Sequence, residues 1–110
     1  MRELVLFRVG SYMTILSIEP SGKVAISSGG VGGEYYLLIE PDDKPALLSA
    51  LAKASDKTLP NTLTAVQVDE LVVVLINALF TTSKEDPSIP IRAFLDEYKV
   101  KYRSDYWSSR

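Results

Sequence analysis

The sequence predicts an α+β fold in which a four-stranded antiparallel meander is followed by three helices. Apolar and aromatic residues alternate in short runs up to residue 40, whereas later they recur at the three- and four-residue spacing of helices. Glycine and proline separate the early runs, as they do between short strands. The chain has 110 residues, of which 46% are hydrophobic, so we expect one core and a single domain over residues 1–110.

The strand region contains four segments rich in aliphatic, β-branched and aromatic residues. The first two segments meet near Gly10, which predicts a hairpin there. Pro20 and Gly22 then occupy turn positions that suit the fixed φ of proline and the conformational freedom of glycine, which predicts a second hairpin. The four predicted strands cover residues 3–9, 11–19, 23–27 and 34–40.

Four of the six glycines fall between residues 29 and 33, immediately before the fourth strand. Such a run resembles a phosphate-binding loop, but those loops lead from a strand into a helix, whose free N–H groups hold the phosphate. Here the glycines lead into a strand, and a dinucleotide fingerprint would need glycine or alanine where Tyr35 stands. We therefore predict a wide, mobile hairpin loop, with a ligand-binding loop as the alternative.

Three later segments carry the spacing of amphipathic helices. The first is preceded by Asp42 and Asp43, which are placed to cap it, and Pro45 fits its first turn. In the second, Thr64 and Gln67 have the spacing of a capping box, and the wide apolar stripe predicts that this helix is the most buried element. The three predicted helices cover residues 41–55, 65–80 and 90–98.

The last residues combine aromatic and basic side chains. Val100 and Tyr102 alternate with charged residues, which is compatible with a short closing edge strand, while a helical or a disordered end stays an alternative. Aromatic residues among basic ones can stack on single-stranded bases or anchor a protein interface. Neighbouring acidic residues dilute the positive charge, so a protein interface is favoured, with docking of the aromatics onto the sheet as the alternative. The aromatics are Tyr98, Tyr102, Tyr106 and Trp107.

The amino-acid composition limits the reactions and ligands that the chain can support. The chain has no cysteine and no histidine, so it lacks a thiolate nucleophile, a sulfur ligand for zinc and the usual proton-transfer group near neutral pH. A net charge of −2 argues against direct binding to nucleic acid or to an anionic membrane. We expect no enzymatic activity, no cofactor and no metal. No secretory signal is recognisable at the N-terminus and no apolar run is long enough to span a bilayer, so we expect a cytoplasmic location.

Four adjacent acidic pairs are the remaining candidates for chemistry. Paired carboxylates can bind magnesium or share acid–base catalysis. Three of the pairs stand at or before predicted helix starts, where negative charge offsets the helix dipole, so we interpret them as capping or solvated residues. The pairs are Asp42/Asp43, Asp69/Glu70, Glu85/Asp86 and Asp96/Glu97.

A layout of motifs covers nearly the whole chain, in the stretches LFRVGSY, GKVAISSGGVGGEYYLLIEPDDKPALLSAL and FLDEYKVKYRSDYWSS. This layout resembles that of small bacterial immunity proteins of toxin–immunity systems, including contact-dependent growth inhibition and polymorphic toxin systems. The resemblance implies a cytoplasmic antidote that binds one cognate toxin domain and blocks its active surface. Lys99 departs from the layout, because the closing helix of those proteins ends in glycine, and this leaves the end of the third helix open.

The kind of toxin suggests which residues would bind it. A nuclease toxin would present a basic groove, which an acidic protein can fill with carboxylates from its loops, supported by exposed aromatics. The alternative function is a small non-enzymatic interaction or adaptor module, dimeric through an exposed strand edge. The candidate partner-binding residues are Asp42, Asp43, Glu85, Asp86, Tyr106 and Trp107.

Overall fold

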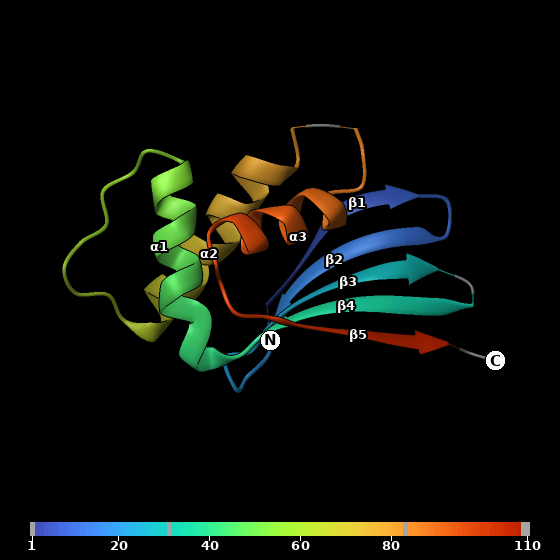
Figure 1. Cartoon of the computed structure of the whole chain (residues 1–110), viewed down its shortest axis with the longest axis horizontal. Coiled ribbons are helices and arrows are strands. Elements are labelled where there is room, and N and C mark those ends of the chain that lie inside the picture. Colours follow the sequence, from blue (N-terminus) through green and yellow to red (C-terminus); the bar gives the residue numbers. More distant parts are fainter. Residues whose placement is uncertain (1, 31, 83, 109–110) are drawn as a thin grey trace.

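The computed structural model describes residues 2–30, 32–82 and 84–108. In these ranges, five strands form one antiparallel sheet in the order β1-β2-β3-β4-β5, and three helices lie between β4 and β5 in the chain (Figure 1). The predicted α+β fold is confirmed. The strands are β1 (Arg2–Val9), β2 (Tyr12–Ile18), β3 (Val24–Gly30), β4 (Gly33–Ile39) and β5 (Arg103–Ser108). The helices are α1 (Lys44–Ala54), α2 (Ala65–Phe80) and α3 (Ser88–Glu97), and a short 3-10 turn, η1 (Pro41–Asp43), precedes α1.

The meander has the predicted hairpins, but the glycine run differs from its prediction. Gly10 has a φ of 58° in the β1–β2 turn, and Gly22 has a φ of 95° in the β2–β3 turn. The glycine run is not a wide loop. Gly30 ends β3 and pairs directly with Gly33, the first residue of β4, so the connection is two residues long. One of these two, Val31, lies outside the described residues.

Close backbone approach, and not loop flexibility, explains why glycine stands here. A Cβ atom on Gly29 would lie 2.4 Å from the carbonyl oxygen of Gly33. A Cβ atom on Gly33 would lie 2.7 Å from the carbonyl oxygen of Trp107 on β5. Neither position can carry a side chain at this strand spacing, so glycine allows β3, β4 and β5 to pair to their ends.

The helix starts follow the predicted signals with two corrections. The third helix begins at Ser88, two residues before the predicted start at Pro90, because proline is tolerated anywhere in the first turn of a helix. Thr64 and Gln67 form the capping box of α2, in which each side chain accepts a hydrogen bond from the backbone N–H of the other residue. Pro45 lies in the first turn of α1, as predicted. Asp43 occupies the N-cap position of α1, but its side chain makes no capping hydrogen bond, because the 3-10 turn η1 leads directly into the helix.

The acidic pair Asp69/Glu70 does not lie at a helix start. Since α2 begins at Ala65, the pair falls in the second turn, where both carboxylates form ion pairs. Asp69 lies 2.5 Å from the ammonium group of Lys44 on α1, and Glu70 lies 3.0 Å from the guanidinium group of Arg2 on β1. These carboxylates therefore connect α2 to its neighbours.

The core lies between one face of the sheet and the three helices. Alternate residues of β2, β3 and β4 are almost fully buried and share one hydrophobic cluster with residues of all three helices. The prediction that the second helix is the most buried element is wrong, since α1 supplies five buried residues and α2 supplies three. The apolar stripe of α2 is wider than the surface it packs on, which leaves Val66 and Val74 exposed. The buried strand residues are Leu6, Thr14, Leu16, Ile18, Val24, Ala25, Ile26, Ser28, Leu37 and Ile39.

A left-handed residue ends α3. Lys99 has a φ of 55°, and its N–H donates to the carbonyl of Asp96 at 3.3 Å. The N–H of Val100 donates to the carbonyl of Leu95 at 2.9 Å, and the Val100 side chain is buried. This is the Schellman arrangement, in which glycine is the usual left-handed residue. The third helix thus ends at Glu97 although lysine stands in the glycine position.

Replacing Lys99 with glycine is expected to stabilise the fold by up to about 1 kcal/mol. The left-handed conformation costs a residue with a Cβ atom roughly 1–2 kcal/mol, and the greater freedom of glycine in the unfolded chain offsets part of the gain. Urea unfolding measures the change. The control Ser49→Gly, at an exposed position inside α1, should lose about 0.5 kcal/mol, and a destabilised Lys99→Gly would contradict this description of the cap.

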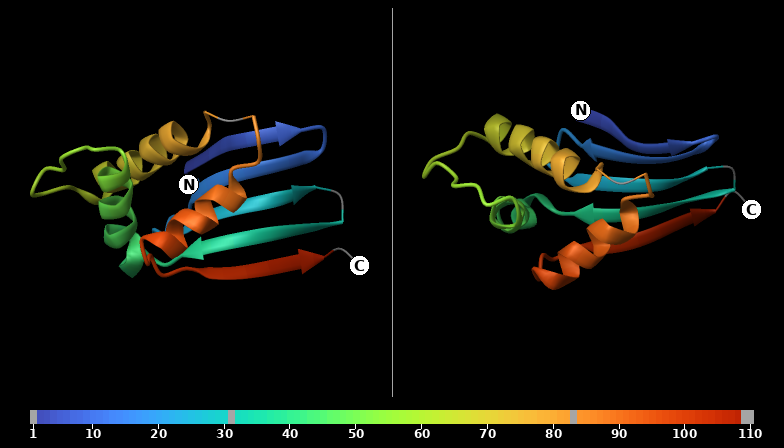
Figure 2. Two further views of the ribbon diagram at one scale, coloured as in Figure 1. Left: turned by 45° about the horizontal axis from the view of Figure 1, so that its top comes forward. Right: turned by 90° about the horizontal axis from the view of Figure 1, so that it is seen from above.

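The strands are longer than the helix layer that covers them. Their ends at the β1–β2 and β3–β4 hairpins, with the end of β5, project past the helices (Figure 2). The predicted closing strand is present as β5, an edge strand that pairs with β4. Among the described residues, none of the helices combines the length and the apolar character needed to cross a bilayer.

Candidate functional site

On the side of the sheet that faces the helices, the residue types change from one cross-strand row to the next. Leu16, Ile26 and Leu37 form a row under the helices. The next row toward the hairpins is polar and aromatic, and the last positions include glycines. The polar and aromatic row consists of Phe7, Thr14, Ser28, Tyr35 and Tyr106. The last positions before the hairpins are Val9, Tyr12, Gly30 and Gly33.

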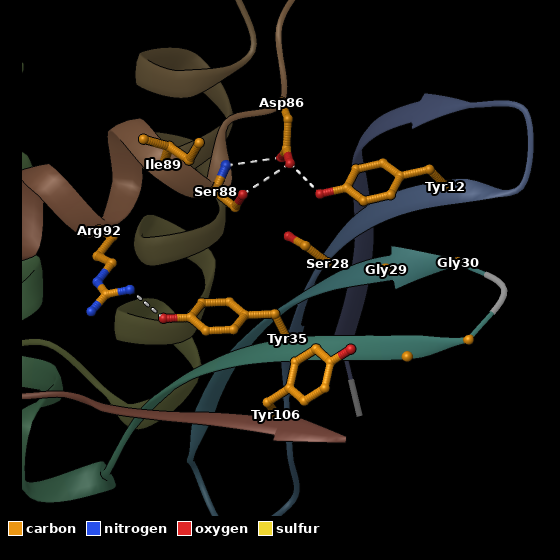
Figure 3. A pocket seen from close by; sticks show the side chains of 12 residues that line it. Tyr12, Ser28, Gly29, Gly30, Tyr35, Asp86, Ser88, Ile89, Arg92 and Tyr106 are labelled. Atoms are coloured by element: carbon orange, nitrogen blue, oxygen red, sulfur yellow. Dashed lines mark hydrogen bonds between the residues drawn. The ribbon is translucent and has the colours of Figure 1, made fainter. Parts of the chain in front are cut away.

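This end of the sheet forms an open hollow of about 850 Å³, which we name the sheet-end hollow (Figure 3). Glycine backbone forms its floor, tyrosines from β2, β4 and β5 stand around it, and the first turns of α3 complete it. Its volume lies in the range of ligand sites, roughly 300–1,000 Å³. The hollow is lined by Tyr12, Ser28, Gly29, Gly30, Gly32, Gly33, Tyr35, Asp86, Ser88, Ile89, Arg92 and Tyr106.

Asp86 accepts four hydrogen bonds at one side of the hollow. Its Oδ1 accepts from the Thr14 hydroxyl at 2.7 Å and from the Ser88 backbone N–H at 3.0 Å. Its Oδ2 accepts from the Ser88 hydroxyl at 2.9 Å and from the Tyr12 hydroxyl. Because Thr14 gives its hydrogen to Asp86, the Ser28 hydroxyl, 3.0 Å away, donates to Thr14. We call these contacts the Asp86 clasp, since they tie the start of α3 to β2.

The Asp86 clasp favours the ionised carboxylate. Partial burial alone would raise the pKa of Asp86, but the hydrogen bonds from Thr14, Tyr12 and Ser88 outweigh burial and lower this pKa below its ordinary value. The pKa of Tyr12, one of the donors, shifts in the opposite direction: burial and the hydrogen bond to Asp86 raise it. A carboxylate offers about four lone-pair sites, so the clasp leaves Asp86 without a free acceptor site for a partner.

Tyr106 covers part of the glycine floor. It pairs with Tyr35 across β4 and β5, and a Cβ atom on Gly33 would come within 2.7 Å of its hydroxyl oxygen. The ring therefore extends over the glycine, an arrangement by which aromatic residues stabilise strand glycines. Tyr106 is still 65% exposed, so much of its surface is open to a partner.

Three residues of α3 line the hollow, and two of them, Ile89 and Arg92, are exposed. The Arg92 guanidinium group donates to the hydroxyl of Tyr35 and lies 5.8 Å from the centroid of the same ring. In the part of the chain that the structure describes, no carboxylate forms an ion pair with Arg92. Ile89 is 76% exposed. The helix thus offers an apolar and a cationic group side by side.

The structure brings two of the six predicted partner-binding residues to the sheet-end hollow and separates the other four. Asp86 and Tyr106 line the hollow. Trp107 follows Tyr106 on β5, and its side chain lies on the opposite face of the sheet because successive strand residues alternate. The remaining acids lie outside the hollow, Glu85 in the loop before α3, and Asp42 and Asp43 in η1 beyond the far end of β4.

Sequence reasoning missed Tyr12, Tyr35 and Arg92. For Tyr12 a signal was present, because it shares a strand face with Thr14 and Leu16, so polar groups stand where the alternation places core residues. A polar break at the end of an apolar alternation indicates where the cover of a sheet stops. Arg92 carries no local signal, since its position on a helix does not reveal which strand it will face.

Comparison of the chain with protein-family models, with curated proteins and with solved structures gives no match in any of the three. Across the described residues, no group of three carboxylates is placed so that it could hold a metal ion. The candidate site is the sheet-end hollow, with the exposed Tyr106 in its lining.

Proposed function

We propose that this protein is an immunity protein that binds a bacterial toxin domain and neutralises it by covering its active surface. The observation that carries the proposal is the open sheet-end hollow with its aromatic and aliphatic rim. Tyr106 and Ile89 expose most of their surface there, and tyrosine is enriched among the residues that contribute most to protein interfaces. The motif layout that resembles bacterial immunity proteins supplies the class of partner.

The chemistry of the hollow favours binding over catalysis. A general base or a nucleophile must offer an unused lone pair to its substrate. Asp86 already accepts four hydrogen bonds, one of them from Tyr12. The hydroxyls of Ser88 and Ser28 act as donors, the first to Asp86 and the second to Thr14, and Asp86 is a poor base to activate either of them because its pKa is lowered. A site whose carboxylate is occupied and weakly basic is better suited to recognising a preformed surface than to catalysis.

The exposed acids outside the hollow have a place in the same function. Asp42 and Glu85 are exposed, and Asp43 is half-buried. Exposed charges at the edge of an interface act mainly on the rate of association. We propose that they steer a basic toxin toward the protein, whereas Asp86 maintains the shape of the hollow.

A homodimeric adaptor is the second candidate function. It is favoured by β5, an edge strand whose residues from Arg103 to Trp107 are all exposed. An unpaired strand edge can pair with another chain. Sedimentation at several concentrations distinguishes the two functions, because a monomer that binds toxin fits the first and a dimer without toxin binding fits the second.

Co-expression in a bacterial host tests the proposed function. The product of the open reading frame directly upstream of this gene is expected to arrest growth, and this chain is expected to restore it. The variant Ile89→Lys with Tyr106→Ala should lose protection yet stay folded, because both side chains are mostly exposed. Circular dichroism checks the fold of each variant.

The matched control carries Val66→Lys and Val74→Lys, two exposed apolar positions on α2 outside the hollow, and should protect fully. The proposed function is wrong if the upstream product is harmless or if the wild-type chain does not relieve its toxicity. Full protection by the folded Ile89→Lys, Tyr106→Ala variant would instead show that the toxin docks on another surface.

A further inference from the structure

We infer that the sheet-end hollow takes an extended segment of the partner protein in which an apolar side chain and a carboxylate stand two residues apart. The inference deepens the proposed function and rests on it, since the occupant is a segment of the toxin. It follows from the shape of the glycine floor, from the sign of the accessible charge, and from the spacing of two residues on α3.

The apolar part of the hollow is a space above the glycine floor. Figure 3 shows Tyr12, Tyr35 and Tyr106 around this floor, with Ile89 on α3. Tyr106 covers Gly33, but the other glycines have no side chain to fill the hollow, which leaves room for a group from outside. An aliphatic or aromatic side chain placed in this space would be removed from water on several sides, which is the main source of affinity for such anchors.

The accessible charge in the hollow is positive. Of the described residues that line it, two are ionised, Asp86 and Arg92, and Figure 3 places them at different sides. The Asp86 carboxylate is enclosed by donors from its own chain. Arg92 is exposed, and among the described residues no carboxylate lies within ion-pair distance of it, although the more distant charge of Asp96 also acts on it. A carboxylate of the partner is therefore attracted to the Arg92 side, where guanidinium can bind it in two-pronged fashion.

The spacing on α3 defines the expected motif. Ile89 and Arg92 are three residues apart on the helix, which puts their Cβ atoms roughly 5–6 Å from each other. In an extended peptide, side chains two residues apart share a face and are separated by roughly 6.5–7 Å. An apolar residue and Asp or Glu at this separation can therefore contact Ile89 and Arg92 together.

The same features disfavour a nucleotide. A diphosphate or triphosphate carries more negative charge than one guanidinium group can balance. Phosphate also binds at helix N-termini, but at the start of α3 the Ser88 N–H already donates to Asp86. A phosphate placed there would meet the Asp86 carboxylate, so a single carboxylate on the Arg92 side is the better fit.

Selection from a random-peptide phage library on the purified full-length chain tests the inference. The enriched peptides are synthesised, and their binding to the chain is measured by titration calorimetry. The enriched sequences should share an apolar residue and Asp or Glu two positions apart. Either Arg92→Gln in the protein or the change of the acid to its amide in the peptide should weaken binding roughly tenfold, because each removes a charged hydrogen-bonded pair.

Further variants test whether the peptides bind at the hollow. Ile89→Lys should weaken the same peptides, whereas Val74→Lys on α2 and Lys53→Gln on α1, both at exposed positions, should not. Four results would each overturn the inference. They are enrichment of basic motifs, binding that is unchanged in both Arg92→Gln and Ile89→Lys, no enriched sequence at all, and ATP binding that Ile89→Lys abolishes.

The two experiments fail separately. If motif peptides bind at the hollow but the wild-type chain protects no cells, the proposed function is wrong and the peptide chemistry stands. If the wild-type chain protects cells and the Arg92→Gln and Ile89→Lys variants protect equally well, the inference is wrong and the proposed function stands.

Discussion

Replacing Asp86 with alanine is expected to destabilise the fold by about 2–4 kcal/mol. The change leaves the hydroxyls of Thr14, Ser88 and Tyr12, and the Ser88 N–H, without their acceptor. Thr14 is fully buried and cannot turn toward water, and a buried donor without a partner costs roughly 1–3 kcal/mol. Loss of the hydrogen bond at the start of α3 adds about 1 kcal/mol. The free energy of unfolding in urea measures the total.

Two further variants bracket this result. Asp86→Asn keeps the shape and one acceptor oxygen, so about half of the loss is expected. Asp42→Ala removes an exposed carboxylate before α1 and should change the free energy of unfolding by less than about 0.5 kcal/mol. A loss below about 1 kcal/mol for Asp86→Ala would mean that the Asp86 clasp does not hold α3 to β2.

The Asp86 clasp also makes stability depend on pH. Because the folded pKa of Asp86 is lowered, its contribution is complete above the pKa of the unfolded chain, about 4, and is lost as the pH falls through the lower folded pKa. The stability of the wild type should therefore fall more steeply than that of Asp86→Asn below about pH 4. Equal slopes for the two proteins in acid would contradict the lowered pKa.

Gly29→Ala is expected to have the second largest effect, a loss of about 3 kcal/mol. The added Cβ atom would lie 2.4 Å from the carbonyl oxygen of Gly33 and 2.8 Å from the Cα atom of Glu34. Both are backbone atoms of β4, so they cannot move away without breaking the hydrogen bonds between β3 and β4. The strand ends must separate or the register must shift, and urea unfolding measures the cost.

Ser27→Ala is the matched control for the glycine variant. Ser27 stands two residues earlier on the same face of β3, where it pairs with Tyr36, and its change should cost less than about 0.5 kcal/mol. Gly10→Ala separates backbone strain from collision, because its Cβ atom would have no neighbour within 4 Å although its φ is 58°. It should lose only about 1 kcal/mol. Equal stability of Gly29→Ala and Ser27→Ala would show that β3 and β4 are not closely paired at Gly29.

Short-range patterns were sufficient to predict most of the fold. The alternation in β2, the turn at Pro20 and Gly22, and the capping box of Thr64 and Gln67 each depend on residues close in the chain, and each is confirmed. The glycine run was misinterpreted because glycine suits a mobile loop and a close backbone approach equally well. Only the pairing of β3 with β4, and of β4 with β5, distinguishes the two.

By itself the sequence determined the α+β class, the approximate positions of the strands and helices, and the absence of cysteine and histidine chemistry. The tertiary structure decided the site, because the tyrosines of the sheet-end hollow come from three strands and Asp86 and Arg92 come from the region that starts α3. They meet because the strand register aligns the tyrosines and because the sheet extends past its helices. The periodicity of apolar residues along the chain does not predict how much of the sheet the helices leave uncovered. The same long-range contacts decide that Asp86, expected on a loop that faces a partner, uses its hydrogen bonds to hold the fold together.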